Sequence, residues 1–441
     1  MNVQEITSKH TYGTWRPQKG WKPIHVVKAE GSCFWDAAGK RYLDFSAQLM
    51  CSNLGHQNPA VVEAICKQAR ELAFIAPSYA CDIRATLATK LLEVVPKGLD
   101  KFFFATSGTE ANEAAIKIAR LYTGKHKILA RYTSYHGSTG GTIGLTGDFR
   151  RWFFEPGGVL PGILHGPETN CYRCPLGKEH PSCEIACADY MDYMITHDEN
   201  VAAVIIEPVV GTNGVLVPPK DYLPRLAEIC KKRGVLLIAD EVMSGWGRTG
   251  EWFAVDNWGV TPDILVTAKG ITSAMAPLGL VATHERISAH FDDNWFPHGH
   301  TYEAHPLTLA PAVAAIDEYK RLGLIGRAKT VGAKFGEKLK AMAMKHPSVG
   351  DVRGIGMFWA VELVKDRTTK EPLNTPQDKV ARKPMIIDQV AAEMLARGVT
   401  IVAWISHLVI APPLIITEAE LDEGLAAMDA ALTVADKAIG K

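Results

Sequence analysis

Four segments of the chain end or follow an apolar run with a residue that can do chemistry. The run that closes at Lys269 places an amine where poor solvation lowers its pKa and frees it as a nucleophile. Asp240 follows another apolar run, and a carboxylate in such a place needs a cation or a metal as partner. Residues 107–112 form a small, hydroxyl-bearing helix start, which suits an anion, and Tyr135 offers a ring that can stack on a planar ligand.

Each segment also has an ordinary structural explanation. Ser107 serves equally well as a helix cap, Asp240 could cap the next helix, and a lone lysine after a strand is usually solvated. Together, however, the segments supply a phosphate cup, a stacking ring, a carboxylate for a protonated ring nitrogen and a desolvated lysine. Those are the parts needed to hold pyridoxal 5'-phosphate (PLP) as a Schiff base.

The elements that must position these groups are short apolar runs that alternate with helical patterns. Strands that are apolar on both faces predict a mostly parallel sheet covered by helices on both sides, and therefore an α/β fold. In such a sheet, ligands bind outside the carboxyl ends of the strands, so the four segments should meet there. The predicted strands cover residues 102–105, 128–132, 201–207, 235–239 and 264–267.

Three helices carry clear start signals. Asn58 before Pro59 predicts one start, and Ser107 with Glu110 predicts another, for a helix that ends near residue 124. The third start is the capping-box pattern of Thr417 and Glu420 ahead of the last apolar periodicity.

The chain beyond residue 325 has a different pattern. It predicts a helix, a strand over 357–363, a long polar loop over 366–384, a helix over 386–397 and a strand over 401–404. We therefore expect a large cofactor-binding domain over residues 51–324 and a smaller α+β domain over residues 325–441. Residues 1–50 are expected to pack with the smaller domain.

The composition excludes several classes of protein. The 441 residues are 47% hydrophobic and 22% charged, which is typical of a globular protein. Lys plus Arg and Asp plus Glu both number 48, so the net charge of zero argues against bulk binding to nucleic acid or membrane. No apolar run is long enough for a membrane helix, and the polar N-terminus lacks a signal core. With nine cysteines, an odd number, we expect a cytoplasmic protein.

Seven segments resemble the class III, or omega-amino acid, aminotransferases of the fold type I PLP enzymes. They occur in the family's order and spacing across essentially the whole chain: SGTEANEAAIKIAR, YHGSTGG, VIIEPVVG, IADEVMSGWGRTG, PDILVTAKG, GHTYEAHP and APPLIIT. The resemblance implies a PLP-dependent transaminase that moves an amino group from an amine or omega-amino acid to a keto acid by a ping-pong mechanism.

The resemblance also assigns roles to individual residues. Lys269 would form the Schiff base and carry the proton, and Asp240 would pair with the ring nitrogen. Tyr135 and Val242 would lie on the two faces of the cofactor ring. The remaining cofactor residues of the motifs are Ser107, Gly108 and Thr109 at the phosphate, His136 and Glu207 near Asp240, and Thr301, which would reach the phosphate from a second subunit. A shared site implies a homodimer, with pairing of dimers into tetramers left open.

The chain departs from the family's pattern where many members bind a substrate carboxylate. Residues 401–410 contain no arginine, and Thr212 stands where ornithine- and 4-aminobutyrate-specific members carry an acid. An apolar wall with Trp404 favours a taurine-, β-alanine- or arylalkylamine-like donor, with Met50 also lining the substrate pocket. Pyruvate is the expected acceptor by resemblance, and Arg150 or Arg151 are the candidates for holding its carboxylate.

Some motifs of the sequence are also compatible with other functions. Residues 245–250 match G-x-G-x-x-G, but the strand end comes too early and bulky residues crowd the loop, which disfavours an NAD-dependent dehydrogenase. PLP-dependent lyases, mutases and decarboxylases share the cofactor site and stay open. No catalytic metal is expected, although a structural metal on Cys171, Cys174, Cys183 and Cys187 is left open. The histidines 298, 300 and 305 match a family loop.

Overall fold

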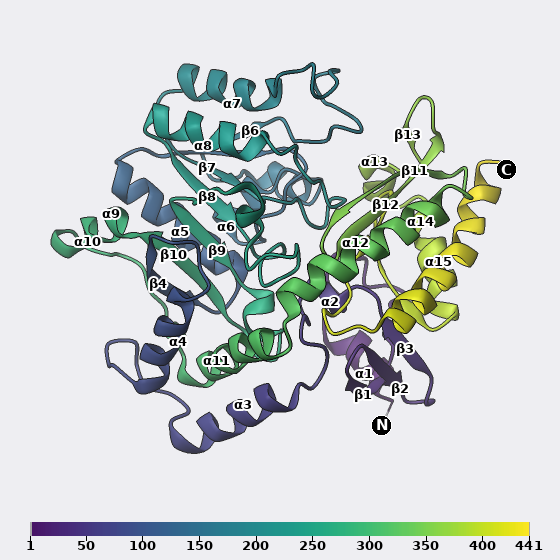
Figure 1. The fold of residues 1–441 in the computed structure, drawn as a ribbon, viewed down its shortest axis with the longest axis horizontal. Helices are drawn as coiled ribbons and strands as arrows, with labels where there is room; N and C mark the ends of the chain where they lie inside the picture. Colours follow the sequence, from purple (N-terminus) through teal and green to yellow (C-terminus); the bar gives the residue numbers. More distant parts are fainter. Residues whose placement is uncertain (1, 441) are drawn as a thin grey trace.

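A computed structural model describes residues 2–440 of the chain. Figure 1 shows two bodies of secondary structure side by side. One is built around a large sheet, and the other contains the N-terminal strands together with the C-terminal helices and strands. The N-terminal and C-terminal parts of the chain therefore lie together in the second body.

The large sheet has seven strands in the order β4-β10-β9-β8-β7-β5-β6. Its strands are β4 (Leu99–Ala105), β5 (Lys127–Arg131), β6 (Ile163–Gly166), β7 (Val201–Ile206), β8 (Leu236–Asp240), β9 (Ile264–Thr267) and β10 (Gly279–His284). Only β10 runs antiparallel to its neighbours β4 and β9, so this is the mostly parallel sheet that the sequence predicts. Every residue of β7 and β8 is buried, as expected for strands covered on both faces.

Helices cover the large sheet and join its strands. They are α3 (Pro59–Glu71), α4 (Asp82–Leu92), α5 (Gly108–Thr123), α6 (Gly140–Leu145), α7 (Ala186–His197), α8 (Tyr222–Arg233), α9 (Glu285–Ser288), α10 (His290–Asp293) and α11 (Pro306–Arg321), with 3-10 turns η1 (Arg151–Phe153), η2 (Glu155–Gly157), η3 (Ala254–Trp258) and η4 (Lys269–Thr272). The predicted caps of α3 and α5 are confirmed. Asn58 accepts hydrogen bonds from the N–H groups of Ala60 and Val61, and Ser107 accepts one from Glu110.

Two smaller sheets form the second body. Strands β1 (Val26–Glu30), β2 (Cys33–Asp36), β3 (Arg41–Asp44) and β14 (Val399–Thr400) form one sheet. The other contains β11 (Val349–Ile355), β12 (Phe358–Asp366), β13 (Glu371–Pro372), β15 (Val402–Trp404) and β16 (His407–Ile410). Their helices are α1 (Val3–His10), α2 (Ala47–Met50), α12 (Leu324–Ala343), α13 (Pro376–Val380), α14 (Ile386–Ala396) and α15 (Glu418–Ala438). The pairing of β3 with β14 joins the N-terminal segment to the C-terminal one, while the domain boundaries at residues 50 and 324 stay a prediction.

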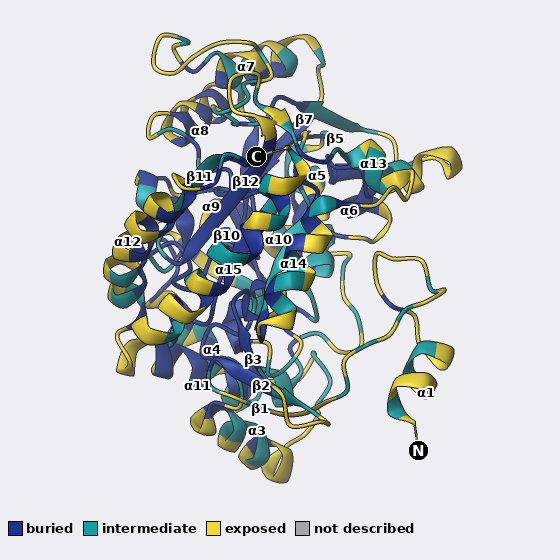
Figure 2. Ribbon diagram, turned by 90° about the vertical axis from the view of Figure 1, so that its right-hand side faces the viewer, coloured by how far each residue is buried: buried dark blue, intermediate teal, exposed yellow. Residues whose placement is uncertain are grey.

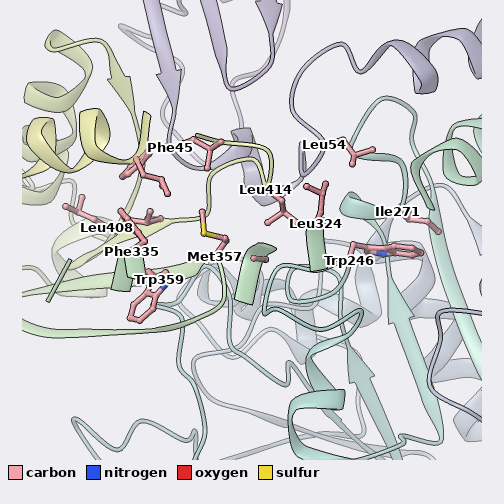
Figure 3. Packing of buried hydrophobic residues seen from close by; sticks show 14 of the residues in the cluster. Phe45, Leu54, Trp246, Ile271, Leu324, Phe335, Met357, Trp359, Leu408 and Leu414 are labelled. Carbon is pink, nitrogen blue, oxygen red and sulfur yellow. The ribbon is translucent and has the colours of Figure 1, made fainter. Parts of the chain in front are cut away.

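One hydrophobic cluster runs through both bodies. Figure 3 shows Phe45 of the N-terminal segment and Met357 of the C-terminal sheet on one side, with Trp246 and Ile271 of the large sheet's loops on the other. In contrast, α1 buries none of its residues, and in Figure 2 it stands apart from the rest of the chain. No helix among residues 2–440 is both long and apolar enough to cross a membrane.

The predicted strands are all present, shifted by a few residues at their ends. The prediction omitted β6 and β10 of the large sheet and β1, β2, β3, β11, β14 and β16 of the second body. Of these, β1 is mostly exposed, and β6 is short and only partly buried. The predicted loop over residues 366–384 was wrong in part, since it contains β13 and α13. Its capping box, in which Thr375 and Asp378 exchange hydrogen bonds, is a helix signal hidden in a polar stretch.

Candidate active site

A cavity of about 190 Å³ opens at the carboxyl ends of the central strands. Its lining includes eight of the residues that the sequence predicts for the site, namely Gly108, Thr109, Tyr135, His136, Glu207, Asp240, Val242 and Lys269. Asn112, Gly137, Ser138, Met243 and Ala268 complete the wall. A larger hollow of about 1030 Å³ lies elsewhere on the surface and contains none of the predicted residues. The predicted site residues therefore converge on the smaller cavity.

Lys269 stands two positions after the last residue of β9, where η4 begins. Its backbone has a φ of 51°, a left-handed conformation that costs a non-glycine residue on the order of 1 kcal/mol. Burial lowers the pKa of the Lys269 amine, while the nearby Cys51, Asp240 and Glu207 act to raise it. An amine with a lowered pKa is more often unprotonated, so it can attack a carbonyl.

Asp240 ends β8 and is 3% exposed. Its Oδ2 accepts hydrogen bonds from Nδ2 of Asn112 and Nδ1 of His136, each at 2.8 Å, and its Oδ1 accepts the backbone N–H of Val242 at 3.1 Å. All three donors hold the carboxylate in one orientation, and none of them is an arginine or a lysine. The charge of Asp240 therefore stays available for a cation in the cavity.

The start of α5 and the loop after β5 form a close-fitting cup. A Cβ on Gly108 would lie 2.9 Å from Cγ2 of Val242, and one on Gly137 would lie 2.2 Å from Oγ1 of Thr109. Thr109 Oγ1 also accepts the N–H of Ser138 at 3.1 Å, which fastens the loop to the helix. The first N–H groups of a 16-residue helix have no partner within the helix, so the cup suits a phosphate.

Glu207 follows β7 and is buried against the same cavity. Its two carboxylate oxygens accept the backbone N–H groups of Tyr135 at 2.9 Å and of Gly211 at 2.8 Å. Burial raises the pKa of Glu207, and the charge of Asp240 raises it further. This carboxyl fixes the backbone on both sides of the cavity.

Two buried polar atoms beside the cavity have no hydrogen-bond partner. They are Nε2 of His136 and Oδ1 of Asn112, whose other side-chain nitrogens both hold Asp240. Such atoms are rare in folded proteins and indicate a missing ligand or water. The cup, the lysine and the acid without a cation are the donor set that PLP requires, so the residues fit this cofactor.

Comparison with known proteins gives the same answer over the whole chain. Residues 16–432 match the family model for Aminotransferase class-III. The chain is 36% identical to the leucine/methionine racemase of Thermococcus litoralis, over 93% of this chain and 91% of the racemase. It is 33% identical to the taurine–pyruvate aminotransferase of Bilophila wadsworthia, over 99% and 98% of the two chains.

The solved structure of taurine:2-oxoglutarate aminotransferase from Bifidobacterium kashiwanohense, in complex with PLP and glutamate, superimposes with a TM-score of 0.93. The two chains are 37% identical, with 99% of this chain and 98% of the other covered. This chain is a class III aminotransferase. The predicted fold type, enzyme class and PLP cofactor are thereby confirmed.

An arginine inside an aromatic box lies next to the cofactor cavity of the aminotransferase. The guanidinium carbon of Arg150 lies 3.7 Å from the ring centre of Tyr135, 4.7 Å from that of Trp404 and 5.7 Å from that of Trp15. Its Nε donates to both oxygens of Asp148, at 3.0 and 2.9 Å, and its Nη2 also contacts that carboxylate. These bonds use the Nε–H and one N–H of Nη2, so the two N–H groups of Nη1 remain to meet a ligand.

The remaining predicted residues lie outside the cavity lining. Trp404 stacks on Phe149 with 5.3 Å between ring centres, so it reaches the site through the Arg150 box. Met50 is 5% exposed and belongs to a buried hydrophobic cluster. Ser107 caps α5 behind the cup, as its ordinary explanation predicts. Thr301 is exposed between α10 and α11, and its predicted contact with a second subunit stays a prediction.

Sequence reasoning assigned no role to Asn112, Gly137, Ser138, Met243 and Ala268 of the cavity lining, or to Trp15 of the aromatic box. Asn112 is a buried amide on an otherwise alanine-rich face of α5, and that contrast was a usable signal. Trp15 gave no signal, because the N-terminal segment shows no periodicity and reaches Tyr135 only in the folded chain. Arg150 was named but not distinguished from Arg151, which instead pairs with Glu155 on the surface.

Two alternative sites lose their support. Among residues 2–440, no three His, Cys, Asp or Glu side chains lie close enough together to hold a metal ion. This holds for the four cysteines and for the three histidines named above. The cysteines are free thiols. In the glycine-containing loop over residues 245–250, the side chains of Trp246 and Arg248 are fully buried, so the loop is packed with protein and has no room for a dinucleotide.

Proposed function

We propose that this aminotransferase takes the amino group from a donor without an α-carboxylate, of the taurine, β-alanine or arylalkylamine type, and passes it to a keto acid. The observation that carries the proposal is the Arg150 box. It offers one arginine donor, Nη1, among aromatic rings, while residues 401–410 contain no arginine for a carboxylate next to the amine.

The position of Arg150 supports this choice of substrate. A sulfonate or carboxylate at the far end of a short donor would accept from Nη1, because Asp148 occupies the other side of the guanidinium. The rings of Tyr135, Trp404 and Trp15 would pack on the chain of the donor or on an aryl group. The relatives named for taurine, with pyruvate or 2-oxoglutarate as acceptor, agree with such a pocket. Pyruvate is the proposed acceptor.

The cavity residues divide the cofactor work between them. When bound, PLP stores the electrons of the broken C–H bond and carries the amino group between the two substrates. Lys269 would hold it covalently and Asp240 would pair with its ring nitrogen. Gly108 and Thr109 would hold its phosphate, with Tyr135 and Val242 at the ring.

Lys269 would also move the proton. Burial lowers the pKa of the Lys269 amine, which favours its unprotonated form, so with the cofactor bound this amine would take the proton from the donor carbon. The same amine then delivers the proton, and the sequence runs in reverse with the keto acid in a ping-pong cycle. Glu207 and His136 would hold Tyr135 and Asp240 in place during both halves.

Two further expectations belong to this proposal. Thr301 would complete the phosphate cup of a partner subunit in a homodimer, which fits its exposed position. The enzyme would act in the cytoplasm, consistent with its nine free cysteines.

The experiment is a half-reaction with the purified, PLP-loaded enzyme. Taurine, β-alanine, 1-phenylethylamine and alanine are added one at a time, and the visible band of the cofactor is followed. We expect taurine or β-alanine to bleach the band, an aldehyde or keto product to appear, and pyruvate to restore the colour. Failure of all donors without an α-carboxylate, alongside rapid bleaching by alanine, would contradict the proposal.

Racemisation of apolar α-amino acids is the second candidate, because a 36% identical relative is a leucine/methionine racemase. The two activities differ in what happens to the amino group. A racemase interconverts L- and D-leucine without a keto acid and keeps the amino group on the substrate. Chiral chromatography of leucine incubated with the enzyme, with and without pyruvate, separates the two.

A further inference from the structure

A row of four residues crosses the C-terminal sheet from the substrate pocket to its far edge. Trp404 of β15 pairs with His407 of β16, His407 pairs with Glu362 of β12, and Glu362 pairs with Asp351 of β11. Residues directly opposite one another in a sheet have neighbouring side chains on one face. Trp404 is the end of the row that touches the Arg150 box.

Glu362 is the centre of this row, and its side chain is fully buried. It accepts a hydrogen bond from Nη1 of Arg353 at 2.7 Å, and Nε2 of His407 lies 3.1 Å from its Oε2. Nη2 of Arg173 contacts its Oε1. Burial alone would raise the pKa of Glu362, but the bond from His407 and the charges of His407, Arg353 and Arg173 hold that pKa well below its usual range.

His407 links the ion cluster to the tryptophan. Its Nδ1 lies 3.3 Å from the backbone oxygen of Trp404, while its Nε2 faces Glu362. A carbonyl oxygen and a carboxylate can only accept, so both ring nitrogens must donate for the row to be satisfied. The sharp turn between β15 and β16, with Ile405 at a φ of 56°, is thereby tied to β12.

The row also faces the loop that follows β7 in the large sheet. Nε1 of Trp404 donates to Oδ1 of Asn213 at 3.0 Å, and Nε of Arg353 donates to the backbone oxygen of Gly214 at 2.7 Å. A Cβ at Gly214, whose φ is 107°, would lie 2.7 Å from both Arg353 and His407. The row and the loop are therefore packed tightly against each other.

We propose that Glu362 and His407 are positioning residues that set the donor specificity of the enzyme by fixing the indole of Trp404 against the Arg150 box. The inference rests on the proposed function. It also gives a role to the cysteine-containing loop between β6 and α7, which supplies Arg173 from between Cys171 and Cys174. The wall of the substrate pocket is thus held by a charge cluster that touches neither cofactor nor substrate.

The test compares donors of different size in Glu362→Gln, His407→Gln and Trp404→Ala. Glu362→Gln keeps the shape and removes the charge, so we expect KM for β-alanine or taurine to rise about 10-fold with kcat within about 3-fold. The preference for these compact donors over 1-phenylethylamine should fall by a similar factor, and Trp404→Ala should lose at least as much.

His346→Gln is the matched control, since His346 also bridges two carboxylates, Asp436 at 2.7 Å and Asp429 at 3.1 Å, but ties α15 to the chain far from the pocket. It should lower the melting temperature and leave donor preference unchanged. Arg173→Gln removes a partly exposed arm of the cluster, so it reports on the row even where a buried variant does not fold.

A second readout does not need turnover. Hydrogen–deuterium exchange of the segment over residues 399–410 should speed up in Glu362→Gln and Arg173→Gln, and stay unchanged in His346→Gln. Folded, PLP-loaded variants that keep both the wild-type donor preference and the slow exchange, while Trp404→Ala loses the preference, would overturn the inference. A wild-type enzyme that accepts none of the donors would instead defeat the proposed function, with the exchange result still deciding the role of the row.

Discussion

The enzyme buries acidic side chains in two regions and treats them in opposite ways. In the cofactor cavity, Asp240 and Glu207 accept only from an amide, an imidazole and backbone N–H groups. In the C-terminal sheet, Glu362 is surrounded by two arginines and a histidine. The first arrangement leaves negative charge uncompensated by any arginine, and the second neutralises it fully.

This difference teaches how a ligand site can be told from a structural ion cluster. A buried carboxylate that lacks a cationic side chain is unfavourable until something positive arrives, so its geometry is held by neutral donors that do not cancel its charge. Glu362 needs no ligand, because the protein itself supplies the cations. Lys269 is the predicted catalytic lysine that lies beside the cavity acids, and burial lowers the pKa of its amine.

Removal of the Lys269 amine should have the largest effect. Lys269→Ala is expected to lower turnover by at least about 1,000-fold, because both the covalent attachment and the proton carrier are lost. Borohydride reduction followed by peptide mass analysis gives a readout without turnover, since only the wild type should carry cofactor on the peptide with residue 269. Labelling of another lysine in the wild type would contradict the assignment.

Removal of the uncompensated charge comes next. Asp240→Asn keeps the hydrogen-bonding shape and is expected to reduce kcat by about 100- to 1,000-fold, because a neutral partner no longer favours a protonated cofactor ring. Single-turnover bleaching by the best donor measures the loss directly. The neighbouring buried acid Glu241 gives the control, since Glu241→Gln should leave the half-reaction nearly unchanged. Equal effects of both substitutions would mean that Asp240 has no specific role at the cofactor ring.

The substrate arginine should have an intermediate effect that depends on the donor. Arg150→Met is expected to raise KM for taurine or β-alanine about 30-fold, the value of one charged hydrogen bond, and to affect 1-phenylethylamine much less. Arg151→Met is matched in sequence position and chemistry, but its side chain pairs with Glu155 at the surface. If both variants lose affinity equally for all donors, the acid-binding role of Arg150 is wrong.

The smallest effects concern stability and should have opposite signs in the two regions. Burial raises the pKa of Glu241 to about 7, so this acid favours the folded state at low pH and loses that contribution as pH rises from about 4.5 to 7. Glu362 has a lowered pKa, so its contribution is present above about 4.5 and is lost as pH falls.

Urea unfolding against the wild type measures both signs, for Glu241→Gln at pH 5 and pH 8 and for Glu362→Gln at pH 3.5 and pH 6. The free energy of unfolding of Glu241→Gln, relative to wild type, should be about 2 kcal/mol higher at pH 8 than at pH 5. The free energy of unfolding of Glu362→Gln, relative to wild type, should be lower at pH 6 than at pH 3.5, because the wild type loses the Glu362 contribution as pH falls. Parallel pH profiles for the two variants would show that the environments of these acids do not differ as described.

The sequence predicted the cofactor half of the site better than the substrate half, and the reason is physical. Asp240 ends a buried strand, and Glu207 and Lys269 each come within two residues after one. Parallel strands bring their carboxyl ends together whatever the rest of the chain does. Trp15 and Arg150 lie outside the sheet, and no local sequence pattern indicates that their side chains are in contact. The same holds for the row behind Trp404, which depends on strand register that a sequence does not display.

The N-terminal segment carries one more consequence. Its helix buries nothing, yet Trp15 a few residues later reaches the ring of Tyr135. A helix with no buried residue is therefore followed by a tryptophan that contacts the proposed substrate pocket. Mutations in this segment can therefore change the substrate range with little change in the free energy of unfolding.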